Sequence, residues 1–200
     1  MAVNNFDRVA PIYDWLAKLV FGDSLLDGQT FFLDLLDNES HLLILGGGSG
    51  MLLEELPAVK DVDYVEKSYE MIQQAKKRRT ENSISFAHQD FLEWETEKQY
   101  DFIFCPFFLD CFNEENLKLV ISKIQKLLKP EGRLLVTEFE VGTTNNLLSG
   151  LMHFFFRITA NLESKRLASI HLKITTHNFE LDEEKFFYQN MIFSRVYRNL

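Results

Sequence analysis

Apolar positions along the chain fall into two patterns that alternate from residue 41 onward. Short, nearly continuous apolar runs predict strands buried on both faces, because helices cover both sides of a parallel sheet. Longer segments with apolar residues three or four positions apart predict helices that bury one face. The expected strands are residues 41–45, 62–65, 83–87, 100–105 and 133–138. The third alternates polar and apolar residues, which favours a place near the sheet edge.

Helices are expected between these strands. Residues 51–56 begin one helix, residues 68–79 form a second, and residues 114–128 form a third. The third has one continuous apolar face, made of Leu117, Val120, Ile121, Ile124, Leu127 and Leu128. A strand, helix, strand order of this kind predicts a parallel sheet with helices on both faces.

The two ends of the chain follow other patterns. Residues 12–21 and 25–36 predict a helical lead-in, interrupted at Gly22 with Asp23 or Ser24 as the N-cap of its second helix. Residues 179–187 and 191–198, separated by a short polar turn, predict an antiparallel hairpin. The expected fold class is therefore α/β, with a seven-stranded, mostly parallel sheet, a C-terminal antiparallel hairpin and an N-terminal helical lid.

Composition narrows the class of protein. The chain has 200 residues, 46% hydrophobic and 26% charged, as in one globular domain. The net charge of −9 disfavours nucleic acid as a partner, because phosphate binding needs clustered cations. The basic run 76–79 is interpreted as a helix C-terminus. No apolar stretch is long enough to span a membrane, and residues 147–156 come nearest.

Two cysteines, Cys105 and Cys111, lie in one hydrophobic stretch and form no disulfide framework. The first residues have neither the basic nor the apolar region of a secretory leader, so a cytoplasmic protein is expected. The histidines have no ligand spacing with each other or with the cysteines, so no metal site is expected.

The first predicted strand ends in the run Gly46-Gly47-Gly48-Ser49-Gly50. Glycines let ligand atoms approach the backbone, and the start of a following helix offers free N–H groups. The pattern indicates a site for a polar or anionic ligand. It differs from the dinucleotide pattern G-x-G-x-x-G, because Met51 stands where the third glycine would fall.

Two acidic residues follow the next strands. Glu66 ends the second strand, 20 residues after Gly46, where an acid can accept hydrogen bonds from both hydroxyls of a ribose. Asp90 follows the third strand beside Phe91, where a carboxylate can accept from an adenine amino group. The alternatives are a solvated strand end for Glu66 and a helix N-cap for Asp90.

Five segments together resemble the class I S-adenosylmethionine-dependent methyltransferases, in particular the branch of the ubiquinone and menaquinone biosynthesis methyltransferases. Residues 6–14 resemble the N-terminal signature of that branch, and residues 42–50 its first motif. The remaining three segments are residues 65–71, 100–104 and 127–135. The resemblance covers nearly the whole chain and implies a Rossmann-like fold in one domain. Its expected divisions are a lid (1–38), a cofactor-binding core (39–140) and an acceptor-side part with the hairpin (141–200).

The resemblance implies S-adenosylmethionine as cofactor and S-adenosylhomocysteine as product. The glycine loop would wrap the methionine part, Glu66 would hold the ribose, and Tyr13 would belong to a lid over the sulfonium. The full set of implied cofactor residues is Tyr13, Gly46, Gly47, Gly48, Ser49, Gly50, Glu66, Lys67, Met71, Asp90, Phe91 and Cys105, the last through its backbone.

Two positions depart from the family pattern. Ile44 stands where family members carry an acid two residues before the first glycine, an acid that helps to hold the amino group of the methionine part. This departure leaves open a non-catalytic protein that binds the cofactor weakly or binds a protein partner. Glu131 replaces a glycine in the turn at 129–132, which is expected to be harmless. An NAD-dependent oxidoreductase fits the spacing of Glu66 but not the glycine pattern.

Aromatic residues cluster at Phe107, Phe108 and Phe112 and at 154–156, which indicates a small apolar or aromatic methyl acceptor. A general base is needed only if that acceptor arrives protonated, and the candidates are Asp110, His153 and Tyr13. The expected partner is a small molecule. Peripheral membrane contact and either a monomer or a homodimer are compatible with the sequence.

Overall fold

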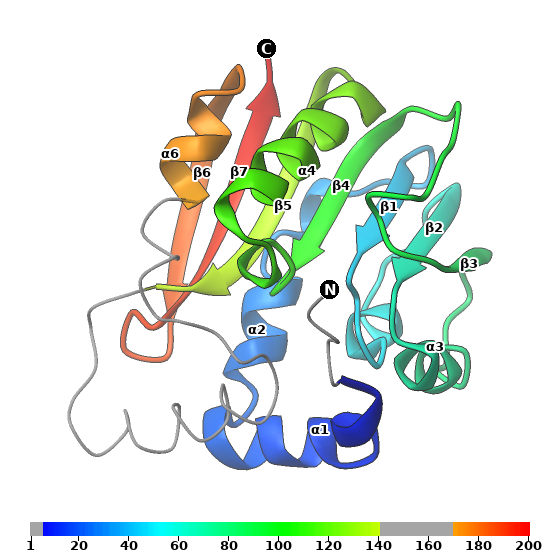
Figure 1. The fold of residues 1–200 in the computed structure, drawn as a ribbon. Coiled ribbons are helices and arrows are strands. Elements are labelled where there is room, and N and C mark those ends of the chain that lie inside the picture. Colours follow the sequence, from blue (N-terminus) through cyan, green and yellow to red (C-terminus); the bar gives the residue numbers. More distant parts are fainter. Residues whose placement is uncertain (1–5, 141–169) are drawn as a thin grey trace.

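The computed structural model describes the backbone of residues 6–140 and 170–200, with side chains from residue 14 in the first range. In this part of the chain, strands form one sheet in the order β3-β2-β1-β4-β5-β7-β6 (Figure 1). They are β1 (His41–Leu45), β2 (Asp61–Glu66), β3 (Ile84–His88), β4 (Tyr100–Pro106), β5 (Leu128–Phe139), β6 (Phe179–Phe187) and β7 (Ile192–Asn199). The first five pair in parallel, whereas β7 is antiparallel to β5 and β6. The predicted mostly parallel sheet with a C-terminal hairpin is confirmed, and β3 lies at an edge as expected.

The helices are α1 (Phe6–Phe21), α2 (Ser24–Thr30), α3 (Tyr69–Ala75), α4 (Glu114–Leu127) and α6 (Ile170–Thr175), with short 3-10 turns η1 (Leu33–Leu35), η2 (Met51–Glu54) and η3 (Leu109–Cys111). The predicted apolar face of α4 is buried with α6 against one side of the sheet. Residues of η1, η2 and α3 pack on the other side. Helices therefore cover both faces, and α1 runs below the carboxyl ends of the parallel strands (Figure 1).

Four predicted helices differ from the structure in length or type. Helix α1 begins at Phe6, ahead of the start expected at residue 12. The helix expected at 25–36 ends at Thr30, whose hydroxyl donates to the carbonyl of Leu26, and a separate 3-10 turn follows. The helix expected from residue 51 is the 3-10 turn η2. Helix α3 ends at Ala75, short of Arg79, because the chain tightens into i→i−3 hydrogen bonds there. Apolar spacing identified where these segments bury side chains but not their hydrogen-bonding pattern.

Strand β5 is longer than predicted because it begins before the turn expected at 129–132. The pairing of β4 with β5 shifts register between Tyr100 and Phe102, and Glu131 has a φ of 61°. A side chain on Gly132 would lie 2.8 Å from the carbonyl of Lys129, so the chain folds tightly at this point. The predicted turn is present as an irregularity inside the strand.

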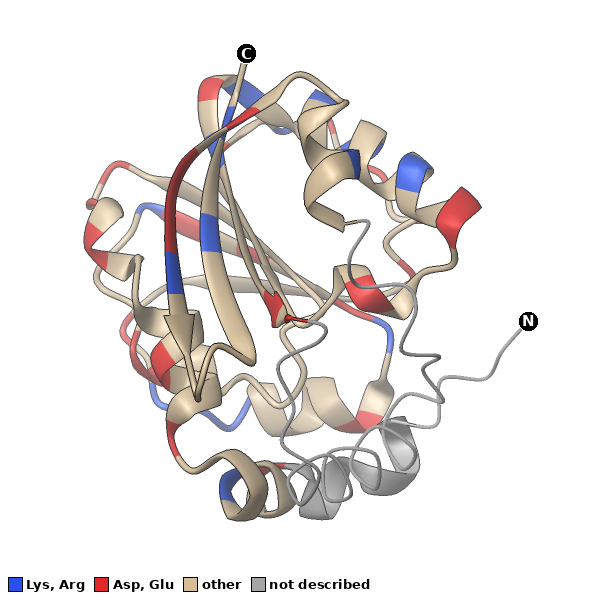
Figure 2. Ribbon diagram, turned by 90° about the vertical axis from the view of Figure 1, so that its left-hand side faces the viewer, with Lys and Arg blue, Asp and Glu red and all other residues tan. Residues whose placement is uncertain are grey.

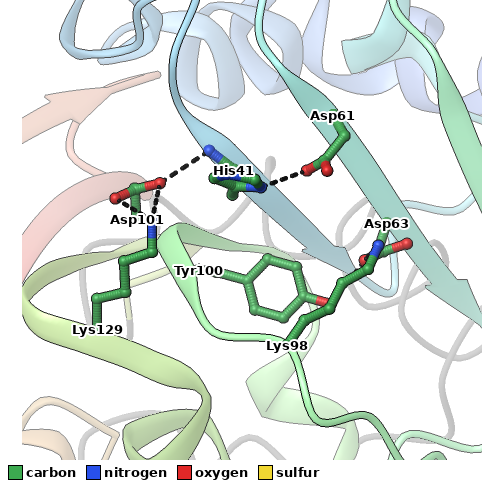
Figure 3. A network of polar contacts seen from close by, with 7 residues as sticks. All are labelled: His41, Asp61, Asp63, Lys98, Tyr100, Asp101 and Lys129. Carbon is green, nitrogen blue, oxygen red and sulfur yellow. Dashed lines mark hydrogen bonds and ion pairs between the residues drawn. The ribbon is translucent and has the colours of Figure 1, made fainter.

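A polar network lies at the amino ends of the parallel strands, opposite the glycine loop (Figure 3). The backbone N–H of His41 donates to Asp101, whose carboxylate also accepts from Lys129 at 2.8 and 2.9 Å. Beside it, Asp63 accepts at 2.7 Å from both Tyr100 and Lys98. These contacts join the starts of β1, β2, β4 and β5 without reaching the opposite edge of the sheet.

Charged residues are frequent on the strands of the C-terminal hairpin, as Figure 2 shows. Arg195 and Arg198 of β7 form ion pairs with Glu184 and Glu180 of β6. Charges on an edge strand discourage pairing with another chain. Among the described residues, no helix is long and apolar enough to cross a membrane.

Candidate functional site

A cavity of about 660 Å³ opens at the carboxyl edge of the parallel strands. This is the edge where ligands bind in open α/β sheets. Nine of the residues implied by the family resemblance line it: Gly46, Gly47, Gly48, Ser49, Glu66, Lys67, Met71, Asp90 and Phe91. The fold thus brings together residues from the ends of three strands.

The glycine loop is shaped by positive φ angles and by close packing. Gly46 and Gly48 have φ of 65° and 60°, which residues with a side chain adopt only under strain. A side chain on Gly47 would lie 2.5 Å from the Tyr64 ring, and one on Gly46 would collide with the Phe108 ring. Gly50 does not line the cavity. Its missing side chain allows contact with Ala75 of α3 instead.

Glu66 joins the glycine loop to helix α3. One carboxylate oxygen accepts from the N–H of Gly48 at 3.2 Å, and the other accepts from the N–H of Ser68 at 2.7 Å. Ser68 in turn caps α3, since its hydroxyl accepts from the N–H of Met71. Glu66 is therefore held by backbone donors at the cavity wall rather than left as a solvated strand end.

Asp90 caps a turn rather than the helix that the sequence offered as one alternative, and it lies at the cavity wall. Its carboxylate accepts from the N–H of Leu92 at 2.9 Å, as a turn cap does, and it also lines the cavity. Lys67 donates to its other oxygen at 2.8 Å. Burial would raise the pKa of Asp90, but the bonds from Lys67 and Leu92 hold it below the ordinary value. The carboxylate is therefore ionised at neutral pH.

The other side of the cavity is apolar. Phe107, Phe108 and Phe112 line it, and the rings of Phe108 and Phe112 lie 4.9 Å apart at an edge-on angle. Leu25 and Leu26 of α2 complete this wall. Helix α2 is fixed in place because the carbonyl of its Gly28 accepts from hydroxyls of β5 and β7.

Several lining residues were not singled out from the sequence. They are Asp14, Leu25, Leu26, Gln29, Gln89, Cys111, Asn113 and Asn116, among others. Asp14 stands inside the N-terminal signature at 6–14, so that motif already contained a signal. The α2 residues were predicted only as a lead-in helix, because helical spacing does not say what a helix covers.

Besides Gly50, four expected site positions lie apart from the cavity lining or outside the described side chains. Cys105 is fully buried on β4, and burial raises the pKa of its thiol. Asp110 is buried behind the phenyl wall, and burial raises its pKa to about 7. The side chain of Tyr13 and all of His153 lie outside the described residues.

Ile44, the departure from the family pattern, is fully buried on β1 among apolar side chains. The aromatic run at 154–156 also falls outside the described residues. The basic run 76–79 follows the end of α3, as interpreted, and its Arg78 is engaged in ion pairs with Asp14 and Glu54.

Comparison with known families agrees with this geometry. A family whose description is "Methyltransferase domain" matches residues 42–132. These residues form a methyltransferase domain. The match covers β1 to the start of β5, including the glycine loop, Glu66 and Asp90. The resemblance to class I S-adenosylmethionine-dependent methyltransferases is thus confirmed at the level of family and fold.

Curated relatives of the methyltransferase domain include two malonyl-[acyl-carrier protein] O-methyltransferases. The one from Priestia megaterium is 35% identical over 121 residues, which are 58% of this chain and 43% of that protein. The one from Acetivibrio thermocellus is 31% identical over 143 residues, 68% of this chain and 48% of that protein. The matched region thus spans less than half the length of each relative, and neither name refers to ubiquinone or menaquinone.

The fold also occurs in the crystal structure of the N-methyltransferase NodS from Bradyrhizobium japonicum WM9, in complex with S-adenosyl-L-homocysteine. The TM-score is 0.63 at 18% identity, and the alignment covers 99% of this chain and 89% of NodS. At this identity the likeness concerns the fold.

Proposed function

We propose that the methyltransferase domain transfers the methyl group of S-adenosylmethionine to a small apolar or aromatic acceptor, leaving S-adenosylhomocysteine. The observation that carries this proposal is one cavity with two unlike sides. Backbone N–H groups and carboxylates of the glycine loop, Glu66 and Asp90 form one side, and phenyl rings form the other. A cofactor rich in hydrogen-bonding groups suits the first side, and an apolar acceptor suits the second.

The residues present fit this cofactor. The carboxylate of Glu66 accepts from the N–H groups of Gly48 and Ser68 and lines the cavity, and since a carboxylate has about four acceptor positions it suits the hydroxyls of a ribose as well. Met71 and Phe91 offer apolar surfaces for a flat base, and Asp90 beside them can accept from an exocyclic amino group. The glycines expose backbone groups toward the methionine part, with Ser49 and Lys67 at its margins. The roles of Tyr13, Gly50 and Cys105 rest on the family pattern alone.

An apolar acceptor is favoured by the charges around the cavity. Of the described lining residues, the cationic ones are Lys18 and Lys67. Each already forms an ion pair, with Asp23 at 3.2 Å and with Asp90 at 2.8 Å. An acceptor with a free carboxylate would therefore lie against phenyl rings and acidic side chains. For this reason we place the malonyl group named in the curated relatives second among acceptor classes.

The chain's own contribution to the reaction is positioning. When bound, S-adenosylmethionine supplies a methyl group that a sulfonium leaving group has already activated. The phenyl wall at 107–112 orients the acceptor toward the glycine loop and excludes water from that side. Orientation of two reactants can contribute about 7–11 kcal/mol to catalysis in favourable cases. Asp110 does not line the cavity, so as a base it would act through Cys111, whose thiol donates to it at 3.5 Å.

We further propose that residues 1–38 act as a lid, residues 39–140 as the cofactor-binding core and residues 141–200 as the acceptor-side part of one domain. Helix α1 supports the lid, since it runs along the open edge of the sheet and contributes Asp14, Ala17 and Lys18 to the cavity. A small-molecule acceptor in the cytoplasm and a monomer or homodimer complete the proposal.

Ile44 is the reason to test a second function, that of a non-catalytic protein. A buried isoleucine replaces the acid that family members use toward the methionine amino group. A non-catalytic protein that binds the cofactor weakly would show the same cavity without turnover.

Turnover separates the two functions. The full chain is incubated with methyl-labelled S-adenosylmethionine and a panel of small phenols, quinols, aromatic amines and a malonyl thioester. The proposal predicts a labelled product and stoichiometric S-adenosylhomocysteine with an apolar acceptor, both lost in Glu66→Ala. Cofactor binding without turnover on the whole panel supports the non-catalytic alternative. Turnover of the malonyl thioester alone contradicts the proposed acceptor class.

A further inference from the structure

Two buried carboxyl groups lie behind the phenyl wall of the cavity. Glu138, near the carboxyl end of β5, is 0% exposed, and Asp110 in η3 is 5% exposed. Burying a carboxylate is unfavourable unless it is hydrogen-bonded or protonated. Two such groups side by side therefore need a role in the fold or in the site.

Glu138 is bonded to the backbone of the segment that carries the wall. One oxygen accepts from the N–H of Leu109 at 2.7 Å and from the N–H of Asp110 at 3.3 Å. Its other oxygen is buried and has no hydrogen-bond partner in the described part of the chain. A lone oxygen of this kind favours a proton on the pair, because a buried acceptor without a donor is costly.

The same segment forms the apolar side of the cavity. Phe107 has a φ of 51°, an unfavourable angle for phenylalanine, and its N–H donates to the carbonyl of Thr137 at 2.7 Å. Thr137 directly precedes Glu138, so the end of β5 holds both Phe107 and η3. Phe108, between them, packs against Gly46 of the glycine loop.

We infer that Glu138 and Asp110 form a positioning pair that shares a proton, holds residues 107–112 in place and so shapes the acceptor side of the cavity. The assignment of this side to an acceptor rests on the proposed function, whereas the positioning and the shared proton do not.

The electrostatics agree with a shared proton. Burial raises the pKa of Glu138 well above its ordinary value, and the charge of Asp110 raises it further. Burial also raises the pKa of Asp110, to about 7. The titratable groups that face the pair are the thiols of Cys105 on β4 and Cys111 on the segment itself, and Glu66 across the cavity acts on Cys111. Burial raises the pKa of both thiols, so neither thiol adds a negative charge beside the pair at neutral pH.

Cys111 provides a reporter that needs neither cofactor nor acceptor. Its side chain lines the cavity and its thiol donates to Asp110, whereas Cys105 is fully buried. Alkylation of the full chain by iodoacetamide, followed by peptide mass spectrometry over a pH series, gives the rate at Cys111. Because only the thiolate reacts, the midpoint of the rate curve should lie above about 8.5, the value of a free thiol. Cys111→Ser identifies the signal.

Two substitutions at Glu138 separate the effect of its charge from the effect of its hydrogen bonds to the backbone of Leu109 and Asp110. Glu138→Gln keeps an acceptor for the N–H of Leu109 and leaves Asp110 with the single negative charge that a shared proton also leaves on the wild-type pair, so the midpoint for Cys111 should stay within about 0.2 pH units of the wild type. Glu138→Ala removes the support and should raise the rate about tenfold at fixed pH, since it loses charge-assisted backbone bonds. Glu184→Gln, on the exposed face of β6, is the matched control and should change neither quantity.

A midpoint that falls by about half a pH unit or more in Glu138→Gln overturns the shared proton, because it shows a second negative charge on the wild-type pair. An unchanged rate in a folded Glu138→Ala overturns the support. If Glu138→Ala fails to fold, the pH curve of Glu138→Gln decides alone. Absence of methyl transfer in the wild type would contradict the proposed function and leave both thiol results as they are.

Discussion

The hydroxyl of Ser49 donates a 2.5 Å hydrogen bond to the carboxylate of Asp14, although 35 residues separate them. Arg78 completes the contact, since its guanidinium bonds Asp14 and also donates to the carbonyl of Ser49 at 3.0 Å. Helix α1, the glycine loop and the end of α3 are thereby joined at the wall of the cavity. Because Asp14 and Ser49 both line that cavity, the lid and the loop should respond together to a ligand.

Substitution of Arg78 tests this junction without touching a cavity-lining side chain. In Arg78→Met the loop and α1 lose their shared cation, so we expect the affinity for S-adenosylhomocysteine to fall about tenfold, the equivalent of about 1.4 kcal/mol. Calorimetric titration measures the change. Arg79→Met is the control, because Arg79 is exposed and adjacent. Equal affinities for the two variants would show that the junction does not support binding.

Two positions of the glycine loop, Gly48 and Gly50, should differ in their tolerance of a side chain. Gly50 has a φ of 77°, and a side chain there would lie 2.8 Å from the backbone of Ala75. Gly48 has a φ of 60° with open space around it. Gly48→Ala should therefore cost about 1–2 kcal/mol of unfolding free energy through backbone strain alone, and Gly50→Ala clearly more. Urea denaturation compares them, and a smaller loss at Gly50 would contradict the packing described.

The amino-end network should contribute to stability in a pH-dependent manner. Burial would raise the pKa of Asp101, but Lys129 and the N–H of His41 hold it below the ordinary value. An acid whose pKa is lower in the folded than in the unfolded protein stabilises the fold at pH values above its unfolded pKa. That stabilisation is lost as the pH falls through the folded pKa. Asp101→Asn should therefore cost about 1 kcal/mol near neutral pH, allowing for solvent screening, with the difference narrowing toward about pH 4 and below.

Urea denaturation of wild type and Asp101→Asn at several pH values measures this loss. Asp34→Asn, an exposed aspartate on η1, serves as the control. A loss that stays constant down to acid pH would assign the effect of Asp101 to packing rather than to its charge.

The phenyl wall should influence the acceptor more than the cofactor. Phe112 lines the cavity and packs edge-on against Phe108, away from the glycines. Once an acceptor is found, Phe112→Ala should raise its KM about tenfold, Phe112→Leu should raise it less, and affinity for S-adenosylhomocysteine should stay within about twofold. Steady-state kinetics measures the KM of the acceptor, and calorimetry measures the affinity for S-adenosylhomocysteine. If the cofactor affinity changes by a larger factor than the KM of the acceptor, Phe112 belongs to the cofactor side of the cavity.

The positions of the strands along the chain and the main cofactor-side residues could be predicted from the sequence, because both depend on local patterns. The apolar run ending at Gly46 gave β1 with its observed bounds, and the spacing to Glu66 placed two cavity residues at neighbouring strand ends. Such features follow from strand geometry and turn chemistry, which act over a few residues.

Features that depend on contacts between distant segments could not be predicted. Nothing near Asp14 in the sequence indicates its bonds to Ser49 and Arg78. Glu138 was included only as the end of a strand, since an acid at a strand end is ordinarily solvated. Its burial results from residues 107–112 folding over it. Asp110 was predicted as a candidate general base, and it lies behind the wall for the same reason.

The central claim is that the glycine loop and Glu66 hold S-adenosylmethionine, and titration of the full chain tests it most directly. S-adenosylmethionine, S-adenosylhomocysteine and NADH are titrated by calorimetry into wild type, Glu66→Ala and the exposed control Glu81→Ala. We predict binding of the first two at Kd on the order of micromolar, loss of about tenfold or more in Glu66→Ala, no change in Glu81→Ala and no binding of NADH. Failure of both sulfur compounds to bind the wild type, or equal binding to Glu66→Ala, would contradict the claim.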